Sequence, residues 1–419
     1  MERLRVFNWV SLRMQRIGYL KRLIKRVAAS NSSHLDNLGK DLIESSTKRV
    51  RIQIDENLAI YIKARLTTAN YSSIKNQTNT WLKGGGEPPI LQLELQDLYL
   101  SNPQLHSQVG RLAKEDWRKY PQLGLSLGLI RPGTNSRTTR AVSFLHLVSE
   151  EEQQSFIDFQ PNANPFLISF EQSLLFIYSF LENDGEILVP LWSKLLKNSL
   201  SSFTERDAGD FLPSIIRNVI SRYKGRNVPV ELRKRLETLE KNANNIALQL
   251  NVQDYSSVSA REETIRVRIE PTVDFGLLIK SNPFRYEYSF SELGKGLAKS
   301  FSGEEDSIAI GDFLQDRFFS TIAESQRLRV ETLSADEIIP RLKSNWKIIS
   351  SSNGYAPIEE IALLAGIKTL VKENKIMEIN NSRDALIAYQ KANPYAVRFT
   401  VDRLGNLAHA KFVEESSPS

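Results

Sequence analysis

Residues 274–298, DFGLLIKSNPFRYEYSFSELGKGLA, constrain the fold more than any other stretch of this chain. The residues before it, SAREETIRVRIEP, have a helical composition, and Gly276 permits a tight exit from a helix because glycine readily adopts positive φ. An apolar strand, LLIKS, follows, Asn282-Pro283 turns the chain, and YEYSF alternates as a returning strand. Ser289 or Ser291 with Glu292 then begins another helix. The segment predicts a helix, a short antiparallel hairpin and a second helix.

This pattern resembles the C-terminal half of a winged-helix (winged helix-turn-helix) domain, in which a Gly-Leu-Leu exit, an aromatic strand and a polar-Glu-Leu-Gly helix start recur. The resemblance implies that Phe275, Leu277 and Leu278 fill the core beneath the hairpin. Residues 127–145 (LGLIRPGTNSRTTRAVSFL) repeat the phrase more loosely, and the C-terminal residues form a third copy built from two helices and a hairpin. No fixed period links the three copies, so we do not expect a repeat protein.

The letters Asp274-Phe275-Gly276 also match the magnesium-binding DFG of protein kinases, but the rest of that site is missing. A catalytic DFG needs a glycine-rich loop, a strand lysine, a helix glutamate and an H-R-D segment, and no H-R-D occurs in the sequence. The phosphate loop, the G-x-S-x-G elbow and H-E-x-x-H are absent too, and the four histidines are isolated. We expect no cofactor, no metal site and no catalytic residues.

One enzymatic alternative is left open, a metal-dependent nuclease with a carboxylate site. Glu373-Asn374-Lys375 matches the Glu-x-Lys part of such sites, and Asp336 or Glu360 would be the upstream acid. The motif falls at the end of an expected helix rather than on a strand.

The length and composition point to a multi-domain protein without membrane spans. A chain of 419 residues exceeds one ordinary core, and the longest apolar run, LLFIYSFL at 174–181, is far shorter than the ~20 residues of a membrane helix. Zero cysteines exclude disulfides and thiolate metal sites, which fits a cytoplasmic location. We predict a mainly α fold with small β-hairpins (α+β), with tandem winged-helix-like units joined by helical segments. The predicted ranges are a basic helical segment at 1–53, a helical and winged-helix-like domain at 54–150, a helical domain at 151–252, a winged-helix unit at 253–302 and a C-terminal helical and hairpin domain at 303–419.

Capping signals locate several helices. Ser169 with Gln172 opens a helix that we expect to stop at Asp184-Gly185, and Ser334 with Glu337 opens another. Val228-Pro229 marks a further start. Helices are expected at 357–373 and 382–392, followed by a hairpin over 396–413 that turns at 404–406.

The positive charge is concentrated at the N-terminus. Residues 1–53 contain twelve Lys/Arg and four acids, whereas residues 54–419 contain 43 basic and 45 acidic residues. A basic amphipathic helix of this kind suits nucleic acid phosphates, a membrane surface or an organellar address, or it is the solvated face of an ordinary packed helix. Among the functional alternatives we favour phosphate contact, because each neutralised phosphate adds affinity through counterion release.

The expected DNA-binding residues follow from the winged-helix resemblance, in which one helix enters the major groove and the hairpin lies on the backbone. Arg261 and Arg268 share a helix face. We expect Pro271 to interrupt this helix and Glu262 and Glu263 to repel phosphate, which weakens base reading there. The basic, hydroxyl-rich hairpin of the first copy suits phosphate oxygens. The full predicted set is Arg22, Lys25, Arg26, Arg118, Lys119, Arg131, Arg137, Arg140, Arg261 and Arg268.

From these patterns we expect a non-catalytic protein that binds double-stranded DNA, as a regulator or as an accessory subunit of a prokaryotic restriction or antiviral defence complex with protein partners. The first alternative is a scaffold whose winged helices dock other proteins. The second is the nuclease described above. No small-molecule substrate is evident.

Overall fold

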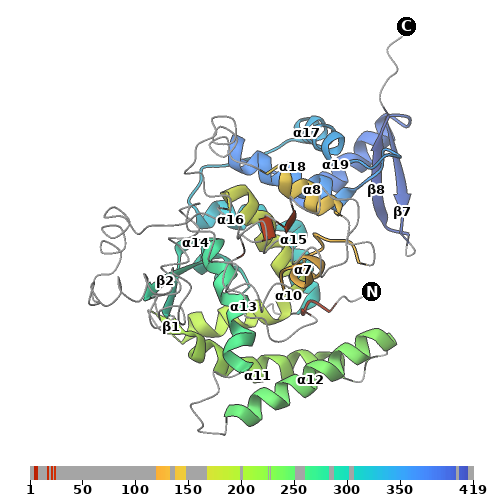
Figure 1. Cartoon of the computed structure of the whole chain (residues 1–419). Coiled ribbons are helices and arrows are strands. Elements are labelled where there is room, and N and C mark those ends of the chain that lie inside the picture. The colour runs from red at the N-terminus through yellow and green to blue at the C-terminus, as the bar shows by residue number, and fades with distance from the viewer. Residues whose placement is uncertain are drawn as a thin grey trace, which may run out of the picture.

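The computed structural model describes residues 4–7, 17, 20, 21, 23, 24, 119–132, 137–147, 168–198, 202–224, 226, 228–250, 260–282, 287–301, 306–402 and 405–413. These residues are mostly helical with short strands (Figure 1), which confirms the predicted mainly α class with small hairpins. The helices are α7 (Lys119–Ser126), α8 (Thr139–Leu145), α10 (Phe170–Lys197), α11 (Glu205–Tyr223), α12 (Val230–Leu250), α13 (Ala260–Asp274), α14 (Glu292–Ser300), α15 (Ser307–Asp316), α16 (Phe318–Ser325), α17 (Ala335–Ile349), α18 (Ile358–Glu373) and α19 (Ile379–Ala392). The strands are β1 (Phe203–Thr204), β2 (Leu278–Asn282), β3 (Glu287–Phe290), β4 (Glu331–Thr332), β5 (Ala356–Pro357), β6 (Lys375–Ile376), β7 (Val397–Val401) and β8 (Leu407–Phe412).

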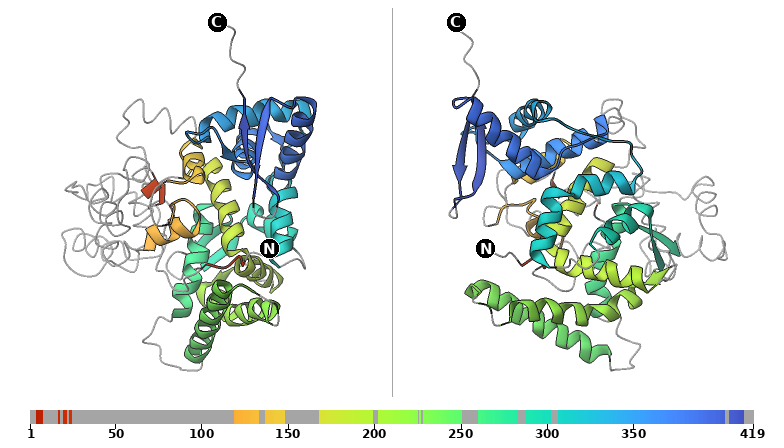
Figure 2. Two further views of the ribbon diagram at one scale, coloured as in Figure 1. Left: turned by 90° about the vertical axis from the view of Figure 1, so that its right-hand side faces the viewer. Right: turned by 180° about the vertical axis from the view of Figure 1, so that it is seen from behind.

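Helix α10 is the central element of the molecule (Figures 1 and 2). Its predicted capping box forms, because Ser169 accepts from the backbone of Gln172 and the Gln172 side chain accepts from the backbone of Ser169. The predicted stop at Asp184-Gly185 is wrong, since the helix kinks at Asp184 (φ −135°, ψ 15°) and continues to Lys197. Gly185 allows α15 to approach closely, because a Cβ there would lie 3.0 Å from the Ile310 side chain.

Two hydrophobic clusters meet on α10. The larger one joins the first half of α10 to α14–α19, and it also takes in α8 and the hairpin β7–β8. The smaller one joins the second half of α10 to α11, α12 and α13. After the kink, Leu188 and Trp192 belong to the larger cluster, whereas Leu191 and Leu195 belong to the smaller. The five predicted domain ranges stay a prediction, and both clusters draw on residues from several of them.

Two small antiparallel sheets share one connectivity. In the region that we call the middle unit (residues 185–290), the strand order is β1-β3-β2. In the C-terminal unit (residues 335–413) the order is β5-β8-β7. In both, a two-residue strand that precedes the helices pairs with the second strand of the hairpin that follows them. A separate parallel pair, β4 with β6, links Glu331 to Lys375.

The hairpin predicted after Gly276 is confirmed. Gly276 has φ +74° at the exit of α13, and no atom lies within 4 Å of a Cβ built on it. Phe275, Leu277 and Leu278 are buried, as expected beneath a hairpin. Ser291 then accepts a hydrogen bond from the Gly294 N–H at 3.0 Å and caps α14.

The helices and hairpin predicted near the C-terminus are confirmed as α18, α19 and β7–β8. The Ser334–Glu337 capping box forms at α17, and α12 begins directly after Pro229. Within the described residues, no helix combines the length and apolarity that a bilayer crossing requires.

Candidate nucleic-acid interface

Arg140, one of the predicted DNA contacts, lies inside the protein. Its Nε donates to Glu360 Oε1 at 2.8 Å, its Nη1 pairs with Glu182, and its guanidinium lies 5.7 Å from the centre of the Tyr178 ring. Burial lowers the pKa of Arg140, but the charges of Glu182 and Glu360 outweigh it and hold that pKa well above its ordinary value. Arg140 therefore joins α8 to α10 and α18, and its assignment to DNA is withdrawn.

Arg268 is buried as well. Its Nε donates to Asp184 Oδ2 at 2.6 Å and its Nη2 to Asp184 Oδ1 at 3.0 Å, while the Phe7 N–H donates to the same carboxylate at 3.0 Å. The guanidinium thus binds the residue at which α10 kinks. Arg268 is therefore a structural residue and not a phosphate contact.

The rest of helix α13 is also closed to a partner along residues 265–272. Every residue in this stretch is buried except Arg266, which is partly buried and pairs with Glu205 at 2.7 Å. Pro271 does not interrupt the helix, which continues to Asp274. A recognition helix needs a free face to enter a groove, and residues 265–272 of α13 offer none.

The other predicted residues divide into three groups. Arg131 and Arg137 are exposed and lie at an isolated bridge between Ile130 and Arg137, where a hairpin was expected. Lys119 begins α7 and Arg261 lies in the first turn of α13, but their side chains are outside the described part. The remaining predicted residues, all outside the described residues, are Arg22, Lys25, Arg26 and Arg118.

Of the two acids proposed upstream of the Glu373-Asn374-Lys375 motif, Glu360 lies far from Glu373, whereas Asp336 adjoins Glu337, whose carboxylate binds Lys375. Glu373, at the end of α18, pairs with Arg341, whereas Glu360 lies thirteen residues earlier on the same helix, about 20 Å away at 1.5 Å per residue. Lys375 donates to Glu337 at 2.8 Å, and this hydrogen bond lowers the pKa of Glu337 to about 2. Among the described residues, no three His, Asp or Glu side chains form a group that could hold a metal ion.

Helix α19 has a face that the sequence patterns did not single out. Asn381, Asp384, Ala388 and Lys391 are exposed, and at 3.6 residues per turn they form one narrow line, which we call the exposed stripe. The opposite side of α19 is anchored in the larger cluster by Ile379, Ala385 and Leu386.

The start of α19 is fixed by two polar contacts. The Glu378 carboxylate accepts the backbone N–H groups of Phe319 and Ser320 at 3.1 and 2.7 Å, which caps α16. The Asn380 amide donates to Asp316 at 2.7 Å. These bonds set the orientation of the exposed stripe relative to the rest of the protein.

The hairpin β7–β8 lies beside α19 at the outer edge of the molecule (Figures 1 and 2). Arg398 faces Lys411 across the two strands, and Arg398 is exposed. Lys411 donates to the Asn353 carbonyl at 2.9 Å and lies 5.7 Å from the centre of the Tyr355 ring, which fixes its position. Residues 379–413 contain five Lys/Arg and two acids, and Glu414 and Glu415 follow them.

Comparisons with protein-family models, curated proteins and solved structures give no match for this chain. Its function is therefore inferred from geometry and charge. The sequence contained the signal for the exposed stripe, since polar or small residues recur at three- and four-residue spacing between buried positions of 379–392.

Proposed function

We propose that this chain is a non-catalytic protein that binds double-stranded DNA, and that its C-terminal unit makes the contact. The observation that carries the proposal is the exposed stripe on α19 beside a basic hairpin at the edge of the molecule. A helix of this kind can enter a major groove because only one of its sides is anchored in the protein.

The connectivity of the two units supports the winged-helix resemblance. In a winged helix, a helix and a short strand precede two helices and a hairpin, and the short strand pairs with the last strand. The C-terminal unit has this order in α17, β5, α18, α19, β7 and β8. The middle unit has it in the second half of α10, β1, α11, α13, β2 and β3, with α12 as an insertion. We therefore propose that the middle unit and the C-terminal unit are two winged-helix domains in tandem.

The chemistry of the exposed stripe suits base edges better than phosphates. Asn381 lies near the start of α19, and asparagine pairs with adenine through two hydrogen bonds. Asp384 can accept from the cytosine amino group, and Ala388 is small enough to meet a thymine methyl group. Lys391 on the helix and Arg398 on the hairpin would contact phosphates, which position the protein without reading sequence.

The test is the affinity of the full chain for a blunt-ended duplex across a series of salt concentrations, followed by fluorescence anisotropy. Lys391→Ala and Arg398→Ala should each weaken binding to all duplexes and reduce the slope of log affinity against log salt by about 0.9. Asn381→Ala should change the preference among duplexes and leave the slope unchanged. Lys234→Ala is the matched control, because Lys234 is exposed on α12, at the opposite end of the molecule in Figure 1.

Duplex binding that is absent, or that is unchanged in both Lys391→Ala and Arg398→Ala, would overturn the proposal. The wider role, as a regulator or an accessory subunit of a restriction or defence complex, is part of the same proposal and depends on duplex binding.

The alternative, a scaffold that docks proteins, is favoured by the middle unit. Its helix α13 and hairpin pack within the chain, and Tyr288 of β3 donates to Glu205 and Glu270 in the interior. A winged-helix unit can thus serve as a packing module. Salt-independent binding of a protein partner, with no duplex binding, would favour this function over the first.

A further inference from the structure

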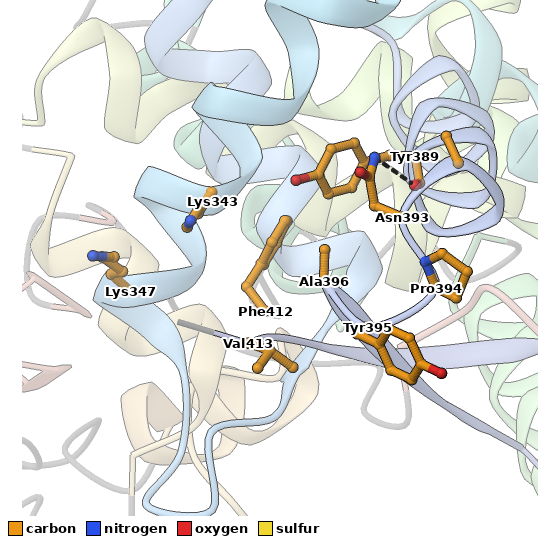
Figure 3. A pocket seen from close by; sticks show the side chains of 10 residues that line it. Lys343, Lys347, Tyr389, Asn393, Pro394, Tyr395, Ala396, Phe412 and Val413 are labelled. Carbon is orange, nitrogen blue, oxygen red and sulfur yellow. Dashed lines mark hydrogen bonds between the residues drawn. The ribbon is translucent and has the colours of Figure 1, made fainter. Parts of the chain in front are cut away.

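A groove lies between helix α17, the end of α19 and the base of the hairpin β7–β8 (Figure 3). Its volume is about 770 Å³. Lys343 and Lys347 stand on one wall, on α17, while Tyr389, Asn393 and Tyr395 stand on the other (Figure 3). Phe412 lies between these walls (Figure 3) and packs against Trp346, the two ring centres being 5.5 Å apart. We call this the C-terminal groove.

The described lining of the C-terminal groove carries positive charge. None of the ten described residues that line it is acidic, and two are lysines. Lys343 and Lys347 are one helical turn apart on α17, so they occupy neighbouring points along the wall. Such a wall attracts a chain with repeated negative charges.

The aromatic side chains of the C-terminal groove add a second type of contact. Tyr395 lies three residues beyond the end of α19 and is 89% exposed, more than any other large hydrophobic side chain in the described part of the protein. Leaving such a ring in water gains nothing for folding. Single-stranded nucleic acids bind through bases stacked on aromatic rings and phosphates held by basic residues.

We propose that the C-terminal groove binds a single strand of nucleic acid, with Tyr395 stacked on a base and Lys343 and Lys347 at phosphates. An acidic peptide would use the lysines but not the exposed ring. The pairing of an exposed tyrosine with lysines along the described wall favours the nucleic acid strand.

The experiment measures binding of the full chain to a labelled oligo(dT) strand by fluorescence anisotropy. Tyr395→Ala should weaken binding about 5- to 100-fold, and Tyr395→Phe should retain it because phenylalanine also stacks. Lys343→Ala should reduce the slope of log affinity against log salt by about 0.7, the value for one phosphate of a single strand. Lys234→Ala, on the exposed surface of α12, should change neither quantity. Because Tyr395 is exposed, its substitution should leave the thermal midpoint unchanged, which separates loss of binding from misfolding.

Three results distinguish this proposal from duplex binding. The groove proposal would be overturned if the chain did not bind oligo(dT), or if Tyr395→Ala bound it with the affinity of the unchanged chain. This holds whether or not the chain binds the blunt-ended duplex. Binding of oligo(dT) without binding of the duplex would support it and overturn the proposed function. The groove would instead be assigned to an acidic peptide if polyglutamate competed as well as unlabelled oligo(dT) and Tyr395→Ala had no effect. That result would also overturn the proposal.

Discussion

Replacing Arg268 tests whether α13 is an interior helix or a DNA-reading one. The Arg268 and Asp184 side chains are 3% and 0% exposed, and hydrogen bonds of 2.6 and 3.0 Å join them. Arg268→Met would leave the carboxylate buried with the Phe7 N–H but without its cation. Removing one member of a buried ion pair costs about 3–5 kcal/mol, because the other charge stays uncompensated.

The expected change in thermal midpoint follows from the size of the chain. With an unfolding entropy of ~2.1 cal/mol/K per residue, 419 residues give about 0.9 kcal/mol/K. The free-energy loss then lowers the midpoint by about 3–6 °C in a calorimetric scan. Arg341→Met is the matched control: the Arg341–Glu373 pair is 24% and 39% exposed, and exposed pairs contribute about 0–1 kcal/mol.

A second substitution isolates the cause. If the stranded charge is responsible, Arg268→Met with Asp184→Asn should be more stable than Arg268→Met alone, because the asparagine carries no charge to compensate. A phosphate contact would behave in the opposite way, with an unchanged midpoint and a duplex salt slope reduced by about 0.9. That pair of results for Arg268→Met would refute the interior assignment.

Two further predictions concern a turn and a pH dependence. Gly276→Ala should lower the free energy of unfolding by about 1–2 kcal/mol, because alanine is strained at positive φ. Gly294→Ala should lower it further, because the new Cβ would lie 2.0 Å from the Leu277 carbonyl oxygen. Urea unfolding of both variants measures the two losses, and a larger loss for Gly276→Ala would contradict the prediction. Burial raises the pKa of the Glu378 carboxyl from its ordinary value of 4.5, so its contribution to stability is fully present below that value and is lost as pH rises through the folded pKa. The free energy of unfolding of the unchanged chain, minus that of Glu378→Gln, should therefore fall as pH rises. Urea unfolding of both proteins at several pH values measures this difference, and an increase with pH would contradict the prediction.

Sequence patterns predicted the elements whose causes are local. Gly276 marks a turn because its positive φ is a property of one residue, and the capping boxes at Ser169 and Ser334 each span only four positions. The hairpin over 396–413 alternates along its own strands. By contrast, the strands β1 and β5 are two residues long, too short to show an alternation of apolar and polar residues, although each completes a three-stranded sheet.

The arginines illustrate what a local pattern cannot predict. Arg140 and Arg268 have the same letters as surface arginines, and their partners lie far along the chain: Glu182 is 42 positions from Arg140, Glu360 is 220, and Asp184 is 84 from Arg268. Whether an arginine faces water or a buried carboxylate depends on those distant residues. The spacing of polar residues along α19 is visible in the sequence, but its exposure depends on which side of the helix α15, α17 and α18 cover.

The two units with one connectivity have opposite relations to solvent, and this difference decides where a partner can bind. In the middle unit, α13 is enclosed between α10, α11 and α12, and its polar residues are neutralised by Asp184, Glu205 and Lys280. In the C-terminal unit, α18 takes the enclosed position against α10, which leaves α19 anchored on one side only. A helix cannot both neutralise its charges inside the protein and offer them to a phosphate. The same supersecondary unit therefore serves as core in the middle of the chain and as a candidate binding surface at its C-terminal end.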